Sequence, residues 1–78
     1  MMIYTHDKKR VINLNKYNGL RLDNVSPGVI NAIAGYAAPG AIETQLADYK
    51  TEERAKEVLE EIVRAESYKK RIYIMPEE

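Results

Sequence analysis

Five basic and aromatic residues in the first half of the chain have side chains suited to holding a nucleotide: Lys9, Arg10, Tyr17, Arg21 and Tyr36. An arginine offers two parallel N–H donors to phosphate oxygens, and a tyrosine ring can stack on a base. If Arg10 and Arg21 lie on adjacent strands, their side chains can approach one another. The same residues also fit an ordinary charged turn and sheet edge, where cations discourage aggregation, and their spacing does not separate the two interpretations.

No arrangement of residues in this sequence predicts an enzyme. Ser26 falls in a turn and Ser67 near the end of a helix, and no histidine follows either serine to act as its base. His6 precedes Asp7 in a polar turn, where a solvated histidine is the ordinary case. The glutamates of residues 52–66 lie on the charged face of a helix, whereas catalytic carboxylate pairs need burial to separate their pKa values. We therefore expect no catalytic residues.

The composition is that of one small domain without a general charge. The chain has 78 residues and a mass of 8.9 kDa, which allows a single core within residues 1–78. Its 12 Lys and Arg balance its 12 Asp and Glu, so no net field attracts double-stranded nucleic acid or an anionic membrane. With no cysteine and one histidine, neither a thiolate nor a multi-histidine metal site is available, and we expect no cofactor.

The location of the protein is predicted from what the sequence lacks. No basic segment followed by an apolar block marks a signal peptide, and no apolar run is long enough to span a bilayer. The absence of cysteine fits a reducing compartment. We therefore expect a cytoplasmic protein.

Local patterns predict an α+β fold. Extended or alternating residues predict strands at 2–5, 10–14, 20–23 and 71–75, and Asn18-Gly19 marks a turn. A helix is predicted after Thr51, a natural N-cap, and its apolar positions follow helical spacing: Ala55, Val58, Leu59, Ile62 and Ala65. The order predicts a small antiparallel β-sheet, one C-terminal amphipathic helix packed on one face, and a final short strand.

The middle of the chain allows two interpretations. The Pro-Gly pairs at 27–28 and 39–40 predict type II turns, so residues 29–37 and 41–49 read as two strands of a hairpin closed near 39–40. The small residues at 32–38 could instead form a helix. Gly35 and the flanking turns favour the strand.

The predicted core is small, which favours self-association. Its candidate residues are Ile3, Ile12, Leu14, Leu20, Leu22, Ile30, Ile42, Leu46, Val58, Leu59, Ile62, Ile72 and Ile74. A chain of this size has a marginal stability balance, and it has neither disulfides nor a metal to help. The alanine-rich residues 29–41 could pack closely against another subunit or against the chain's own helix. We therefore expect a homo-oligomer.

Three segments resemble a family of short phage and prophage proteins of Gram-positive bacteria: residues 7–14 (DKKRVINL), 49–62 (YKTEERAKEVLEEI) and 73–76 (YIMP). They cover both ends of the chain and leave its middle unmatched. The proteins of this family are similar to phage sponge proteins in size, in their sheet-plus-helix plan and in their expected oligomerisation. Sponges bind cyclic ADP-ribose isomers or cyclic oligonucleotides and withhold them from the bacterial Thoeris or CBASS effectors. The resemblance implies an anti-defence protein of the bacterial host cytoplasm, and it carries over no site residue.

Two functions follow as hypotheses. The first is a binding protein that sequesters a nucleotide immune signal without cleaving it. The second is a protein-binding inhibitor or structural interaction module without a small-molecule ligand. A pocket lined by Arg or Lys together with Tyr would favour the first function, and an exposed apolar or acidic patch would favour the second.

Overall fold

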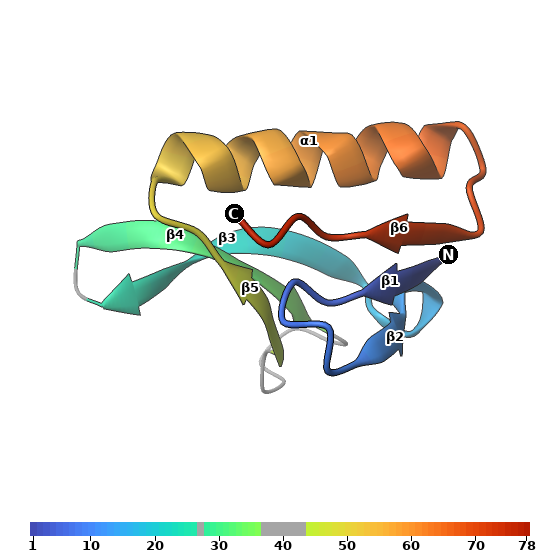
Figure 1. Ribbon diagram of the computed structural model, residues 1–78, viewed down its shortest axis with the longest axis horizontal. Helices are drawn as coiled ribbons and strands as arrows, with labels where there is room; N and C mark the ends of the chain where they lie inside the picture. Colours follow the sequence, from blue (N-terminus) through green and yellow to red (C-terminus); the bar gives the residue numbers. More distant parts are fainter. Residues whose placement is uncertain (27, 37–43) are drawn as a thin grey trace.

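The computed structural model describes residues 1–26, 28–36 and 44–78, in which one long helix lies over two small β-sheets (Figure 1). The α+β prediction is confirmed. In chain order the elements are β1 (Met2–Tyr4), β2 (Val11–Asn13), the 3₁₀ helix η1 (Leu14–Lys16), β3 (Gly19–Ser26), β4 (Val29–Tyr36), β5 (Thr44–Asp48), α1 (Glu52–Ser67) and β6 (Ile72–Ile74).

The strands form two three-stranded sheets rather than the single sheet expected from the sequence. The terminal sheet has the order β2-β1-β6, and the central sheet has the order β3-β4-β5. All pairs are antiparallel except β1 with β6, which run parallel. A parallel pair needs a long crossover between its strands, and here almost the whole chain separates β1 from β6. Hydrophobic alternation reports a strand but not its partner, so it did not predict this pairing.

The middle of the chain forms strands, as Gly35 and the Pro-Gly turns favoured. β3 and β4 make a hairpin, and Gly28 in its turn has φ +80°, the left-handed value that a type II turn asks of glycine. β4 also pairs with β5 in the expected antiparallel sense. The predicted turn at Pro39-Gly40 lies outside the described residues.

The helix begins and ends with well-formed caps. The Thr51 hydroxyl accepts a hydrogen bond from the Arg54 amide at 3.1 Å, which confirms the predicted N-cap. At the other end, the amides of Lys69 and Lys70 donate to the carbonyls of Glu66 and Ala65. This is the Schellman pattern, and Lys69 takes the left-handed position (φ 57°) that glycine usually fills.

The core lies between the inner face of α1 and the two sheets. It is built from Ile3, Ile33, Leu46, Ala47, Tyr49, Ala55, Val58, Ile62 and Met75, with five further predicted residues partly buried against it: Ile12, Leu14, Leu20, Leu22 and Leu59. Ile42 lies outside the described residues, as does the side chain of Ile30.

The predicted core positions in β6 are wrong. Ile72 and Ile74 are 49% and 58% exposed, whereas Met75 is fully buried. Tyr73 also points inward, and its hydroxyl donates a 2.7 Å hydrogen bond to the Glu61 carboxylate on α1. Residues 72–75 are apolar or aromatic at every position, so no polar residue marks the outer face of this strand, and the pattern could not set its phase.

Candidate functional site

Arg21 and Tyr36 lie on the same side of the central sheet. Arg21 pairs with Ala34 across the β3–β4 ladder, and Tyr36 follows two residues later on the same face. Ile33 points to the core, so this face points away from it. The Arg21 guanidinium lies 3.4 Å from the Asp23 carboxylate. The structure therefore brings these two predicted residues to one surface.

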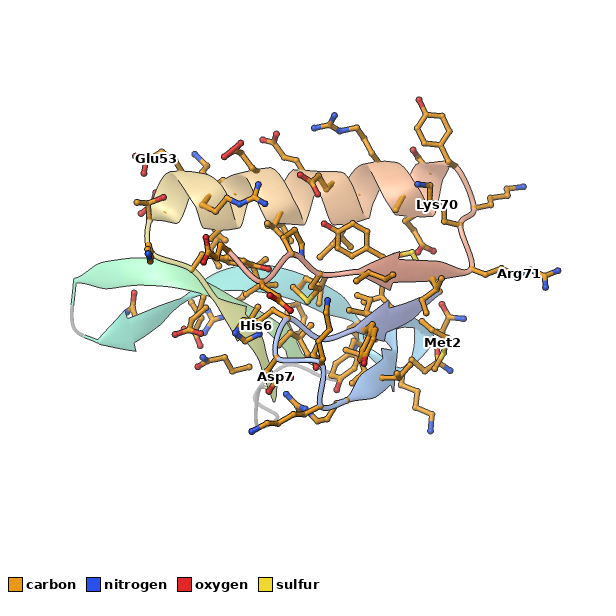
Figure 2. All side chains as sticks on the ribbon, in the orientation of Figure 1. Met2, His6, Asp7, Glu53, Lys70 and Arg71 are labelled. Atoms are coloured by element: carbon orange, nitrogen blue, oxygen red, sulfur yellow. The ribbon has the colours of Figure 1, made fainter. Side chains whose placement is uncertain are left out.

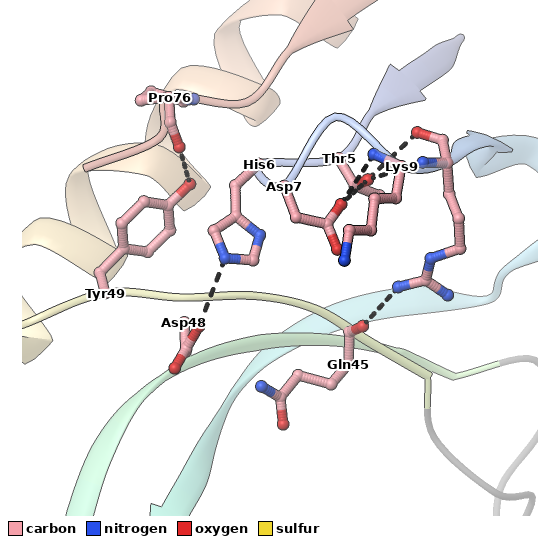
Figure 3. A network of polar contacts seen from close by, with 9 residues as sticks. Thr5, His6, Asp7, Lys9, Gln45, Asp48, Tyr49 and Pro76 are labelled. Atoms are coloured by element: carbon pink, nitrogen blue, oxygen red, sulfur yellow. Dashed lines mark hydrogen bonds and ion pairs between the residues drawn. The ribbon is translucent and has the colours of Figure 1, made fainter.

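Arg10 and Arg21 do not lie on adjacent strands, so the condition for their close approach is not met. Arg10 precedes β2 of the terminal sheet, and Arg21 lies in β3 of the central sheet. The Arg10 guanidinium donates to the Gln45 carbonyl of β5 at 3.1 Å (Figure 3). Gln45 and Arg21 both pair with Ala34, so two strand spacings, about 10 Å, separate their backbones. The two arginines thus approach opposite edges of the central sheet.

Lys9 and Tyr17 lie in two further places. Lys9 is exposed in the turn between β1 and β2, where its amide donates to the Asp7 carboxylate at 3.0 Å. The Tyr17 ring lies against Gly35, where an added Cβ would stand only 2.9 Å from the ring. Leu20 borders the same point, so Tyr17 is on the helix side of the sheet, opposite to Tyr36. The five residues predicted to bind a nucleotide therefore do not converge on one site.

Tyr17 lines a groove of about 740 Å³ between α1 and the η1–β3 segment. Its walls include the apolar side chains of Leu14, Leu20, Leu59 and Val63, and Glu66 is the charged residue at its rim. Among its described lining residues there is no lysine or arginine. The described residues of this groove therefore offer no cation to a phosphate.

A second hollow, of about 520 Å³, surrounds His6. His6 Nε2 lies 3.3 Å from the Asp48 carboxylate, and its ring is 6.0 Å from that of Tyr49 (Figure 3). The Tyr49 hydroxyl donates to the Pro76 carbonyl at 2.9 Å, and burial raises the pKa of Tyr49 to about 12. Tyr49 itself packs in the core.

Asp7 is engaged away from this histidine. Hydrogen bonds from the Lys9 amide and the Thr5 hydroxyl hold the pKa of the Asp7 carboxyl below its ordinary value. His6 therefore faces Asp48 rather than its neighbour in sequence. The contact between His6 and Asp48 connects the β1–β2 turn to the end of β5. The prediction that the protein is not an enzyme stays untested.

The feature that sequence reasoning missed is an apolar face on the terminal sheet. Across its ladders Met2 stands beside Ile72, and Tyr4 stands between Val11 and Ile74, on the side opposite to the core residue Ile3. The exposed fractions are 38% for Met2, 49% for Ile72, 54% for Val11 and 58% for Ile74. We call Met2, Tyr4, Val11, Ile72 and Ile74 the outer sheet face. Ile72 and Ile74 could have indicated the outer sheet face from the sequence only if it were known which residues of β6 point outward.

Charge is divided unequally along this neutral chain. Residues 1–16 and 68–76, which build the terminal sheet and its turns, contain seven of the 12 Lys and Arg and one of the 12 Asp and Glu. Their formal charge is therefore +6, and that of the remaining residues is −6. Figure 2 shows Lys70 and Arg71 at one end of the molecule and Glu53 at the other. The overall neutrality thus conceals a strongly basic terminal sheet.

One basic residue lies directly against the outer sheet face. Lys8 Nζ is 5.1 Å from the centre of the Tyr4 ring, within range of a cation–π interaction, and donates to the Met75 carbonyl at 3.3 Å. An apolar face with Lys8 against it, on a sheet built from strongly basic segments, suits a partner surface that is apolar at its middle and acidic at its edge.

Within residues 1–26, 28–36 and 44–78, no cluster of three or more His, Asp or Glu is arranged to hold a metal ion. In the same part of the chain, no helix has the length and apolar character needed to cross a bilayer.

Comparisons with protein-family models, with curated proteins and with solved structures found no match. The resemblance to phage and prophage proteins therefore stays a prediction from three short sequence segments.

Proposed function

We propose that this protein is a non-catalytic interaction module that binds a partner protein through the outer sheet face. The observation that carries the proposal is the exposure of Val11, Ile72 and Ile74, each about half in water or more, on one open side of a three-stranded sheet. Isolated exposed apolar side chains are common, but a contiguous apolar patch rimmed by charge is typical of a protein interface.

The energetic scale shows how much the outer sheet face can contribute and how much the rest of the contact must supply. Burying an exposed isoleucine or valine side chain contributes roughly 1.5–3 kcal/mol when the burial is complete. Several such side chains on one face therefore supply several kcal/mol, against which association costs about 4–15 kcal/mol of lost freedom. Lys8 and the other cations of the terminal sheet's segments would add mainly to the association rate and to the choice of an acidic partner.

Site-specific photo-crosslinking tests the proposal. A photoreactive amino acid replaces Val11 on the outer sheet face, and the matched control replaces Asn24, an exposed residue of the central sheet. In bacterial cells producing the variants, we expect covalent protein adducts from position 11 and few from position 24. Adding Ile74→Lys should remove the adducts from position 11. Equal yields from the two positions would refute the proposal.

Sequestration of a nucleotide immune signal remains a second candidate. The observation that favours it is the common orientation of Arg21 and Tyr36 on the central sheet. Calorimetry against cyclic ADP-ribose isomers and cyclic dinucleotides tests it, with Arg21→Ala as the variant expected to lose affinity. Affinities weaker than about 1 μM, near −8 kcal/mol, across that panel would end this candidate. Binding that survives both Arg10→Ala and Arg21→Ala would keep the function and reject these residues.

A further inference from the structure

We infer that the partner on the outer sheet face is a second copy of this chain, which docks the exposed side of its helix α1. The inference rests on the proposed function and names the occupant of the same face. The proposed contact is head to tail, because the outer sheet face of one copy meets the helix α1 of the next.

Charge complementarity selects this occupant. The segments around the outer sheet face carry a formal charge of +6, and the rest of the same chain carries −6. Much of the negative charge is on α1, whose exposed residues include five glutamates but only two cations, Lys56 and Arg64. Two sheets packed face to face would instead bring two basic surfaces together. When the helix α1 of a second copy lies on the terminal sheet of the first, its glutamates face the cations of that sheet.

The helix also offers apolar groups for the contact. Val63 on α1 is 62% exposed, and Tyr68, just after its last residue, is 76% exposed. A helix laid on a three-stranded sheet is already the packing within this chain, where the inner face of α1 covers the central sheet (Figure 1). The docked helix would give the terminal sheet the same cover on its bare side.

The proposed contact joins two different surfaces, which has consequences for assembly. Every copy bound through its sheet face still has a free helix surface, so the assembly either grows or closes into a ring. The mean mass should therefore rise with concentration beyond that of two chains, unless a ring closes. Opposite charges attract across the contact, so added salt should weaken it.

Light scattering with size-exclusion chromatography tests the inference with two blocked variants. Ile74→Lys blocks the sheet face, and the double variant Glu57→Lys/Glu60→Lys blocks the helix surface. Asn24→Lys is the matched control, because it adds a lysine at an exposed position outside both surfaces. Circular dichroism and thermal unfolding establish that each variant is folded before its mass is measured.

The expected results are specific to a head-to-tail contact. The wild type and Asn24→Lys should associate above the 8.9 kDa chain mass, and less so at high salt. Each blocked variant alone should remain a single chain. An equal mixture of the two should form a two-chain species and nothing larger, because one intact surface of each kind remains.

Other outcomes would overturn the inference in distinguishable ways. A helix-blocked variant that still forms dimers, or association that tightens with salt, would indicate face-to-face pairing. A wild type of single-chain mass at all concentrations and salt levels would reject self-association. If position 11 then crosslinks to a different protein, the second-copy inference fails but the proposed function is retained. If it crosslinks to nucleic acid instead, both the inference and the proposed function fail. If position 11 yields no protein adduct beyond the control, the proposed function fails as well.

Discussion

Replacing Met75 by alanine tests the phase of β6, on which both the core and the outer sheet face depend. Met75 is fully buried, so Met75→Ala removes apolar contacts and leaves a cavity, at a cost of about 2–5 kcal/mol in the free energy of unfolding. Ile74 is already 58% exposed, so Ile74→Ala should cost roughly 1 kcal/mol, from a loss of about 0.8 kcal/mol per fully buried methylene. Met75→Leu keeps the side-chain volume and should cost less than about 1.5 kcal/mol.

Urea unfolding followed by far-ultraviolet circular dichroism measures these costs, at a protein concentration where the chain is monomeric. A loss of 1 kcal/mol lowers the Tm of a domain of this size by roughly 4–8 °C, so thermal scans should separate Met75→Ala from Ile74→Ala clearly. If Ile74→Ala proved more destabilising than Met75→Ala, the strand would have the opposite phase. The outer sheet face, and the function proposed for it, would then be lost together.

Three further perturbations test the two helix caps and the buried Tyr49. Thr51→Ala should lower the unfolding free energy by about 1 kcal/mol, read from the urea midpoint, because the cap hydrogen bond is lost; an unchanged midpoint would contradict the assigned cap. Lys69→Gly should raise the free energy of unfolding by roughly 0.5–1 kcal/mol, because glycine adopts the left-handed conformation without penalty. A loss of stability would count against the φ of 57° at Lys69. Stability should fall as pH rises from 10 toward 12, since the unfolded chain then releases a Tyr49 proton that the folded chain, with a pKa of about 12, retains. Tyr49→Phe should make this decline of stability with pH shallower. An identical pH profile would refute the raised pKa of Tyr49 as its cause.

Features determined by neighbouring residues were predictable from the sequence. The helix boundary followed from Thr51 and the apolar spacing after it, and the strand over residues 29–36 followed from Gly35 and its flanking turns. The inward positions of Leu20 and Leu22 were also predicted, because Arg21 and Asp23, which alternate with them, marked the outer face. Each of these signals is local, and no distant part of the chain had to be placed to read it.

Features determined by distant contacts were not predictable. The parallel pairing of β1 with β6 joins the two ends of the chain, and nothing in either strand specifies the other. The predicted site failed to converge for the same reason, since Arg10 contacts Gln45, which lies 35 positions away. The outer sheet face required both the pairing and the phase of β6. Within the alanine-rich middle, Ala32 and Ala34 are already buried in the single chain, so they no longer argue for a subunit contact.

The parallel arrangement of β1 and β6 also determines how the molecule would resist mechanical force. The two strands lie side by side, held by hydrogen bonds that include Met2 N to the Arg71 carbonyl at 2.8 Å and Met75 N to the Tyr4 carbonyl at 3.0 Å. Tension applied before residue 2 and after residue 75 would pull the strands along their length in opposite directions. The bonds would then be loaded together in shear rather than opened one at a time, so the terminal sheet would act as a clamp whose rupture governs the rate of forced unfolding.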